Sequence, residues 1–305
     1  MVTARVSPPD AQPLAKPIAA PQAIRRRRGL LRYRADLWSL GWMQVTVALS
    51  LLPFVVHMPL WAEGLLLLPV LFFRSSVAYV QHNQSHLGVF WSRPLNFLYD
   101  LELALMSGYV TALWEQHHVN GHHRHYLTPK KDPARTRDLR TGRDVSRWHY
   151  VVFGNLTVLR DAWRIACAQA AEGRADPRPR AVAQFAVACL VAGALAWRDP
   201  IAFAGFILVP NLLVAWGVWH ISYDHHLNLP MTSHMSGSHS HLSARFNLLT
   251  FNIGHHAAHH EKPTLHWSLL PARSAQILPK LAPESVHGEL PRSVTDAARA
   301  PERVA

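Results

Sequence analysis

Four long apolar stretches constrain the fold of this chain more than any other feature of its sequence. A helix of about 20 apolar residues is long enough to cross the hydrocarbon core of a bilayer. We predict membrane-spanning helices over residues 38–58, 60–81, 181–197 and 200–220, the third being somewhat short. The predicted fold class is therefore all-α and integral to a membrane, with four transmembrane helices and a helical cap that carries the polar residues between and after them.

Within the second stretch, the apolar run 65–80 contains one charged residue, Arg74. Because a lone charge in lipid is costly, its side chain must either reach the near interface or face other helices of the protein. Two further segments, 95–113 and 147–174, are apolar or amphipathic. Each is compatible with a helix lying at the membrane interface and with an ordinary core-facing helix.

The charge distribution predicts the orientation of the spans. Lysine and arginine gather in residues 1–36 and 81–180, whereas the short turns 59–64 and 198–200 hold one basic residue between them. The positive-inside rule then places both termini, and the whole helical cap, on the cytoplasmic side. The net charge of +12 is accounted for by these basic residues beside the spans. Because no zinc-finger, basic-zipper or RNA-binding signature is present, we expect no nucleic-acid partner.

The same distribution divides the chain into three parts. We expect a disordered basic cytoplasmic tail over residues 1–36, because it is rich in Pro, Ala and Arg and has no apolar signal segment. A membrane domain follows over residues 37–275. Residues 276–305 are predicted to form a C-terminal cytoplasmic tail.

Histidine is the second distinctive feature, with 21 residues against 19 of Asp and Glu together. Many of these histidines fall in clusters with helical spacing, each at or just beyond an apolar segment: His82 and His86; His118, His122 and His123; His220, His225 and His226; His256, His259 and His260. Neutral imidazole binds borderline metal ions, and about nine such ligands suit two ions better than one. The two cysteines, Cys167 and Cys189, lack the spacing of a thiolate site.

These clusters resemble the histidine boxes of the membrane fatty acid desaturase and hydroxylase superfamily, H-x(3)-H, H-x(2-3)-H-H and H-x(2)-H-H. The last box and its flanks are similar to the bacterial desaturase-like branch, and they read Phe251-Asn252-Ile253-Gly254, His256-Ala-Ala-His259-His260 and Leu265-His266-Trp267-Ser268-Leu269-Leu270-Pro271. The resemblance covers roughly residues 75–272 and leaves out both tails.

The resemblance implies a set of ligands for two iron ions: His82, His86, His118, His122, His123, His226, His256, His259 and His260. The ninth ligand departs from the family pattern, because Ser222 stands where an Asn is usual; His225 and His220 are the alternatives to His226. Residues expected to orient the ligands by hydrogen bonds are His117, His125, His255, His266, Asn120, Asp224 and Glu115.

The resemblance also implies the chemistry. A non-haem di-iron centre with O2 as co-substrate would desaturate a long fatty acyl chain, carried by a lipid or an acyl carrier protein, or hydroxylate it with the same ligands. Electrons must come from a separate ferredoxin-like donor, because the chain has no cysteine cluster, dinucleotide motif or haem segment. An acidic electron donor or an acidic acyl carrier protein could dock on a group of basic residues: Arg124, Lys130, Lys131, Arg135, Arg137 and Arg140. The implied location is the bacterial inner membrane.

Two other classes of metalloprotein are weaker interpretations. A metal transporter or buffer would place paired ligands within the spans, whereas these boxes lie at their ends. A two-metal hydrolase usually bridges its ions with carboxylates, and only Glu115 and Asp224 are close to the boxes in sequence.

Overall fold

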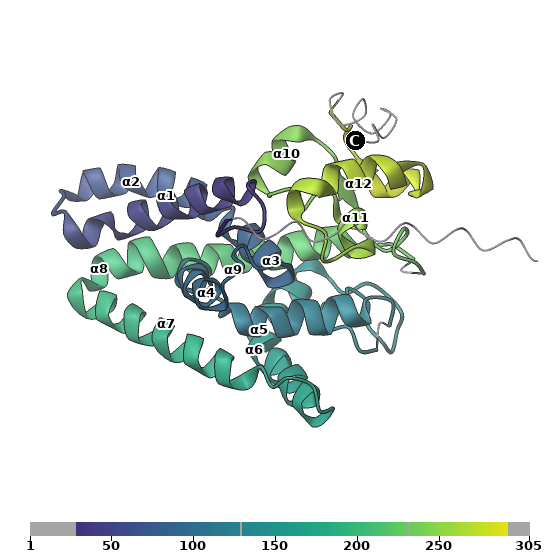
Figure 1. Cartoon of the computed structure of the whole chain (residues 1–305), viewed down its shortest axis with the longest axis horizontal. Helices are drawn as coiled ribbons and strands as arrows, with labels where there is room; N and C mark the ends of the chain where they lie inside the picture. The colour runs from purple at the N-terminus through teal and green to yellow at the C-terminus, as the bar shows by residue number, and fades with distance from the viewer. Residues whose placement is uncertain (1–28, 129, 231, 292–305) are drawn as a thin grey trace, which may run out of the picture.

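The computed structural model describes residues 29–128, 130–230 and 232–291, and its regular structure is almost entirely helical (Figure 1). The helices in chain order are α1 (Asp36–Val55), α2 (Leu60–Arg74), α3 (Val77–His86), α4 (Arg93–Ser107), α5 (Thr111–Glu115), the π-helix η1 (Gln116–His123), α6 (Arg147–Ala171), α7 (Arg178–Arg198), α8 (Pro200–Phe203), the π-helix η2 (Ala204–Leu208), α9 (Val209–His226), α10 (Ala244–Leu249), α11 (His256–Glu261), η3 (Trp267–Leu269), α12 (Leu270–Ile277), η4 (Leu278–Lys280) and η5 (Pro283–Ser285). Within the described residues, the strands are β1 (Ser240–His241) and β2 (Val286–His287), which pair in parallel.

Four helical segments are long and apolar enough to cross a membrane, and they lie within a few residues of the four predicted spans. They run over Asp36–Val55, Leu60–His86, Arg178–Arg198 and Pro200–His226. The second segment is continuous except for a break at residues 75–76, between α2 and α3, and the fourth consists of α8, η2 and α9. The predicted all-α membrane fold is therefore confirmed. Figure 1 shows the long helices side by side, with the shorter helices α10 to α12 gathered at one end.

Arg74 lies at the break in the second span and is fully buried against protein. Its guanidinium donates to the Phe206 carbonyl at 2.8 Å, to the Asn211 side chain at 2.6 Å and to the Met106 carbonyl. A further hydrogen bond reaches Ser50 Oγ at 3.2 Å. Of the two arrangements that the sequence allows, Arg74 therefore faces protein, and it holds four segments of the bundle together.

Replacing Arg74 by methionine is expected to destabilise the protein by about 3 kcal/mol or more, because several buried acceptors lose their donor at once. The measurement is thermal unfolding of the detergent-solubilised protein. The control is Arg198→Met, which removes an exposed arginine at the end of α7. Equal melting temperatures for the two variants would contradict this role of Arg74.

The predicted disordered tail is wrong for residues 29–36. Leu31 pairs with Phe90 in an isolated bridge, and the buried carboxylate of Asp36 accepts hydrogen bonds from His266 Nε2 and the Trp267 indole, both at 2.9 Å. These partners lie far away in sequence, so local composition gave no sign of them. The rest of this predicted tail, residues 1–28, falls outside the described residues.

The C-terminal prediction also needs correction over residues 276–291. Ile277 at the end of α12 is fully buried, and Val286 pairs with Ser240 where β2 meets β1. This stretch is therefore packed on the domain and does not extend from it as a tail. Residues 292–305 fall outside the described part of the chain.

The structure distinguishes the two segments, 95–113 and 147–174, for which the sequence allowed both a core-facing and an interfacial helix. In α4, Leu103 and Met106 are fully buried in the main apolar core. In α6, by contrast, Trp148 is 64% exposed and Leu156 is 74% exposed. Part of the apolar surface of α6 thus points away from the protein, whereas α4 packs into the core.

Candidate metal centre

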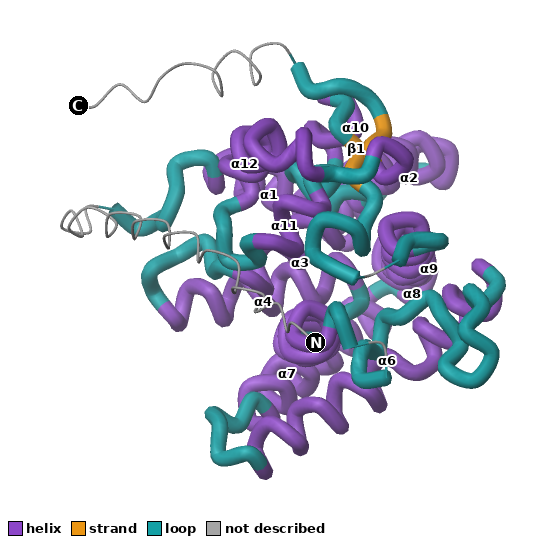
Figure 2. The backbone as a smooth tube through the Cα atoms, turned by 90° about the vertical axis from the view of Figure 1, so that its right-hand side faces the viewer, coloured by secondary structure: helices purple, strands orange, loops and turns teal. Residues whose placement is uncertain are grey.

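The four histidine clusters meet at one end of the helical bundle. They are carried by the last turn of α3, by η1, by the last turn of α9 and by α11, elements that are distant in sequence and adjacent in space (Figures 1 and 2). All nine histidines predicted as ligands lie here, and nearly all of them are buried. Their convergence comes from the packing of helix ends: α3, η1 and α11 each deliver two or three rings about one turn apart, and α9 delivers His226.

The first histidine group has five members. One ligand atom from each lies within 4.8 Å of the others, and the members are His82, His86, His118, His123 and His259. His259 Nε2 is central, because it lies 2.9 Å from His82 Nε2 and 3.0 Å from His123 Nε2. His123 Nε2 is in turn 3.1 Å from His118 Nε2.

The second histidine group contains His122, His226 and His260, again with ligand atoms within 4.8 Å of one another. His256 adjoins it, with its Nε2 atom 3.2 Å from His260 Nε2 and 3.3 Å from His226 Nε2. The two groups are neighbours, since the rings of His123 and His260 stack at 4.3 Å.

The two adjacent-histidine pairs explain why there are two groups. His122 joins the second group and His123 the first, while His259 joins the first group and His260 the second. Neighbouring side chains on a helix diverge by about 100°, so a His-His pair cannot easily send both rings to one point, but it can serve two adjoining points. This division is the structural reason for the paired histidines.

The spacing and protonation of these nitrogens fit metal ions. Nitrogen ligands held about 2.1 Å from one ion are about 3 Å apart when they lie at right angles, which matches the observed contacts. Burial, reinforced by repulsion from neighbouring histidines, holds the pKa of His118, His123, His256, His259 and His260 well below the ordinary value of 6.5. The rings are therefore neutral at pH 7, which is the form that binds metal. His86 also has both ring nitrogens buried without a hydrogen-bond partner among the described residues.

The π-helix η1 corrects the expectation of ordinary helical spacing in the second box. In an α-helix, positions five apart diverge by about 140°, so His118 and His123 would not reach the same group. The wider turn of a π-helix, with its i→i+5 hydrogen bonds, brings them to one side. Gly121 permits the close packing of this turn, because a Cβ there would meet Ile165 at 2.8 Å and Pro133 at 2.9 Å.

Asp132 is a functional candidate that the sequence analysis missed. Its fully buried carboxylate contacts His122 Nδ1 at 3.0 Å. Burial alone would raise the pKa of Asp132, but attraction to and hydrogen bonding with His122 outweigh burial and lower it. A carboxylate on Nδ1 leaves Nε2 of His122 free for a metal. His226 Nδ1 similarly contacts the Gly237 carbonyl at 3.0 Å.

Two aromatic rings also fix ligand orientation. Tyr126 stacks on His260 with ring centroids 3.9 Å apart, and Trp114 lies nearly parallel to His118 at 5.4 Å. Both aromatic residues are only a few positions from the second box. Sequence alone gave no reason to select them over the other aromatic residues of the chain.

The alternative ligand His225 stacks on a clustered histidine, His256, at 4.0 Å. The other alternative, His220, and most of the residues predicted to orient the ligands have other partners. The contacts of the others are His117 with Trp219, His220 with Trp148 and Trp216, His255 with Ser274, His266 with Asp36, Asn120 with Gln116, Asp224 with Arg147 and Glu115 with Arg180; His125 is half-buried beside η1. For the ninth position, His226 lies in the second group and His220 is turned away from it.

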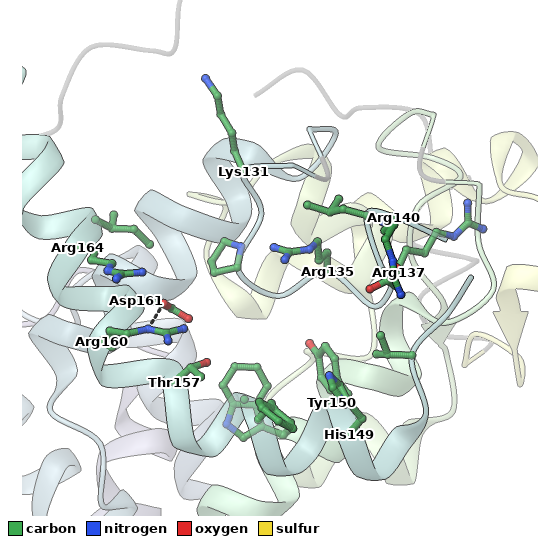
Figure 3. A pocket seen from close by; sticks show the side chains of 18 residues that line it. Lys131, Arg135, Arg137, Arg140, His149, Tyr150, Thr157, Arg160, Asp161 and Arg164 are labelled. Atoms are coloured by element: carbon green, nitrogen blue, oxygen red, sulfur yellow. Dashed lines mark hydrogen bonds and ion pairs between the residues drawn. The ribbon is translucent and has the colours of Figure 1, made fainter. Parts of the chain in front are cut away.

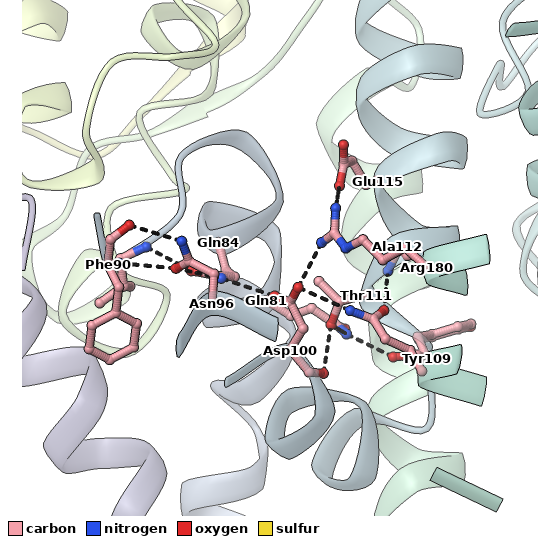
Figure 4. A network of polar contacts seen from close by, with 12 residues as sticks. Gln81, Gln84, Phe90, Asn96, Asp100, Tyr109, Thr111, Ala112, Glu115 and Arg180 are labelled. Atoms are coloured by element: carbon pink, nitrogen blue, oxygen red, sulfur yellow. Dashed lines mark hydrogen bonds and ion pairs between the residues drawn. The ribbon is translucent and has the colours of Figure 1, made fainter. Parts of the chain in front are cut away.

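A polar network ties the first two boxes to α7 (Figure 4). Gln84, which lies between His82 and His86, donates to Asp100 at 2.9 Å. Arg180 of α7 donates to the same buried carboxylate at 2.6 Å and to Glu115, just before η1, at 2.8 Å. The third span thereby fixes the position of α3 relative to η1.

A narrow cavity of about 60 Å³ adjoins the histidines between α3 and α9. Its lining is partly apolar, with Ala78, Tyr79, Trp114, Val218, Ile221 and Ile253. The remaining lining residues are Ser222 and the histidines His82, His118, His122, His225, His226 and His256. Apolar side chains therefore adjoin the clustered histidines in this space.

Comparison with known families bears on this arrangement. Residues 56–288, well over half of the chain and including all nine clustered histidines, match the fatty acid desaturase family. The chain belongs to this family. As a member it is an oxidoreductase of the desaturase and hydroxylase type, and its histidine groups are metal-binding in character. No curated protein matches the chain.

Acid is expected to destabilise the metal-free desaturase-family protein. Burial holds the folded-state pKa values of five clustered histidines well below 6.5 and lowers the pKa of His117 to about 4; the five are His118, His123, His256, His259 and His260. Unfolding then takes up protons below pH 6.5, so stability that is complete above this pH is lost as the pH falls. Melting temperatures between pH 8 and pH 5 should decline steeply below about 6.5.

A matched pair of variants checks whether buried histidines cause this pH dependence. His118→Leu should reduce the change in the free energy of unfolding with pH by up to about 1.4 kcal/mol per pH unit. His149→Leu, at an exposed position, should leave this pH dependence unchanged. A flat profile of the metal-free protein between pH 7.5 and pH 5.5 would count against neutral buried histidines.

Proposed function

We propose that this protein is an O2-dependent fatty acyl desaturase that uses two iron ions held by the nine clustered histidines. The observation that carries this proposal is the pair of adjoining histidine groups beside an apolar cavity. Each His-His pair contributes one histidine to each group, which is the arrangement expected for two neighbouring ions. Iron is proposed from the family, since imidazole alone accepts several borderline metals.

When bound, such an iron pair supplies the activation of O2 and the removal of hydrogen from an unactivated C–H bond. The protein's own residues contribute position and exclusion of water. Asp132 orients His122, the Gly237 carbonyl orients His226, and Arg180 holds α3 against η1 through Asp100 and Glu115. The apolar wall of the cavity keeps bulk water away from the reacting carbon.

The proposed substrate is a long acyl chain that enters from the bilayer. Ala78 and Tyr79 on α3 line the cavity together with Val218 and Ile221 on α9, and both helices belong to membrane spans. A methylene chain between them would lie against the ligand histidines. Hydroxylation of the same chain is the alternative outcome, and we favour desaturation because the last box resembles the bacterial desaturase-like branch.

The proposed setting is the bacterial inner membrane, with the histidine groups and both termini on the cytoplasmic side. This orientation rests on the charge distribution. The two electrons per turnover are proposed to come from a separate ferredoxin-like donor. Either an acyl lipid or an acyl carrier protein would present the chain.

The test combines metal analysis with product analysis. The purified protein should contain two irons per chain, and with a reduced ferredoxin and O2 it should convert acyl chains into monounsaturated products detectable by gas chromatography and mass spectrometry. Hydroxylated products would establish the alternative reaction. Iron-loaded protein that leaves acyl chains unchanged with every donor and carrier would contradict both.

A further inference from the structure

Helix α6 presents three different faces. Its buried face packs on the protein through Val151, Val158, Ala162 and Ala166. A second face is an exposed apolar stripe, which we define as Trp148, Val152, Leu156, Leu159 and Trp163. The third face lines a cleft with Thr157, Arg160 and Arg164. An ordinary surface helix has only two faces, so the exposed stripe and the cleft both need an explanation.

The cleft lies between α6 and residues 131–140 and has a volume of about 650 Å³ (Figure 3). Six of its lining side chains are basic: Lys131, Arg135, Arg137, Arg140, Arg160 and Arg164. The two acidic ones are already engaged. Asp161 pairs with Arg160 at 3.0 Å, and Asp138 accepts from the backbone of Thr141 at 2.7 Å. The cleft therefore carries an excess of positive charge.

Part of this charge is not held in a direct protein contact. Among the described residues, the side chains of Lys131 and Arg164 make no hydrogen bond or ion pair, in contrast to Arg137, which lies 3.6 Å from Asp144. Arg140 interacts with Asp138 electrostatically but makes no side-chain hydrogen bond to it. Figure 3 shows Arg140 and Arg164 on opposite sides of the opening. Several arginines around one concave site favour a ligand with phosphate oxygens, because a guanidinium donates to them in pairs.

The position of α6 relates the cleft to the membrane surface. Near its start, Trp148 lies 5.7 Å from Trp216 and 6.0 Å from His220, at the histidine-bearing end of the fourth span. Near its end, α6 packs against α7, the third span, where Cys167 is a neighbour of Arg178. The helix thus crosses the ends of two spans, where an apolar stripe with tryptophan at both ends is typical of contact with lipid.

We propose that the cleft binds the phosphate of an anionic membrane phospholipid, whose acyl chains lie along the apolar stripe of α6. Neighbouring faces of one helix then serve the two parts of one ligand, and the basic charge complements the headgroup. An acidic carrier protein would use the charge but leave the stripe uncovered. This inference depends on the membrane fold and not on the proposed desaturation.

The experiment measures lipid binding to the full-length protein in a neutral detergent. Short-chain phosphatidylglycerol, phosphatidylcholine and inorganic phosphate are titrated, and binding is read by native mass spectrometry and by the shift in melting temperature. The cleft variant is Arg140→Ala/Arg164→Ala. The control is Arg245→Ala/Lys280→Ala, which removes two exposed basic residues elsewhere.

Phosphatidylglycerol should bind the wild type at least 10-fold more tightly than phosphatidylcholine. The cleft variant should lose about 30-fold in this affinity, and the control should lose little. Inorganic phosphate should compete only weakly, because it lacks acyl chains. Equal binding of the two lipids, an unchanged preference in the cleft variant, or equally strong binding of phosphate alone would overturn the proposal. So would an acidic carrier protein whose binding, unlike that of the lipid, is lost in the cleft variant.

Discussion

Replacing His259 by alanine is expected to reduce turnover more than about 100-fold and to lower the metal content of the purified protein. His259 Nε2 contacts both His82 Nε2 and His123 Nε2, so it joins box one to box two within the first histidine group. Its removal takes away one ligand and also the contact that holds two others together. Product analysis and metal analysis on the same preparation measure both effects.

The matched control for this variant is His266→Ala. Both histidines are almost fully buried, at 2% and 3% exposure, but His266 stacks on Tyr33 and contacts Asp36, away from the nine clustered histidines. The control should therefore retain its metal and lose only part of its activity. A His259→Ala protein with full activity and metal content would remove the di-iron interpretation.

The second large effect is expected at Asp132. Changing it to asparagine should weaken metal binding by about 10–100-fold, because a neutral amide no longer stabilises the orientation and charge of His122 on its metal-facing side. The substitution keeps an oxygen that can accept from the Ala134 backbone, as Asp132 does at 2.8 Å. Competition with a chelator measures the affinity without requiring an active enzyme.

Asp224→Asn is the control for this prediction. The same chemical change is made at the acid that lies close to a box in sequence, but the Asp224 carboxylate contacts Arg147, at 2.5 Å, and not a clustered histidine. Metal affinity should be unchanged in this variant. If Asp132→Asn and Asp224→Asn bind metal equally well, the contact between Asp132 and His122 has no part in holding the metal.

Local pattern was enough to predict the helical membrane fold and to select the histidines that the structure brings together. Each span needs only its own run of apolar residues, and the four observed segments begin and end within about six residues of the predictions. The histidine boxes are equally local, because ligands one turn apart on a helix must be close in sequence. These features depend on residues that are neighbours along the chain, so a single sequence is enough to predict them.

The tertiary structure decided what depends on residues far apart. The separation of His122 and His123 into different groups follows from the π-helical turn and from where His259 and His260 arrive, more than 130 positions later. Arg74 is satisfied by partners 132 and 137 positions away, and the selection of Asp132 over Asp224 rests on how loop 131–140 folds back. The exposed side of α6 could not be predicted either, because an apolar stripe has the same sequence pattern whether it contacts protein or lipid. Packing between distant segments determines which of these alternatives forms, and a short stretch of sequence does not contain that information.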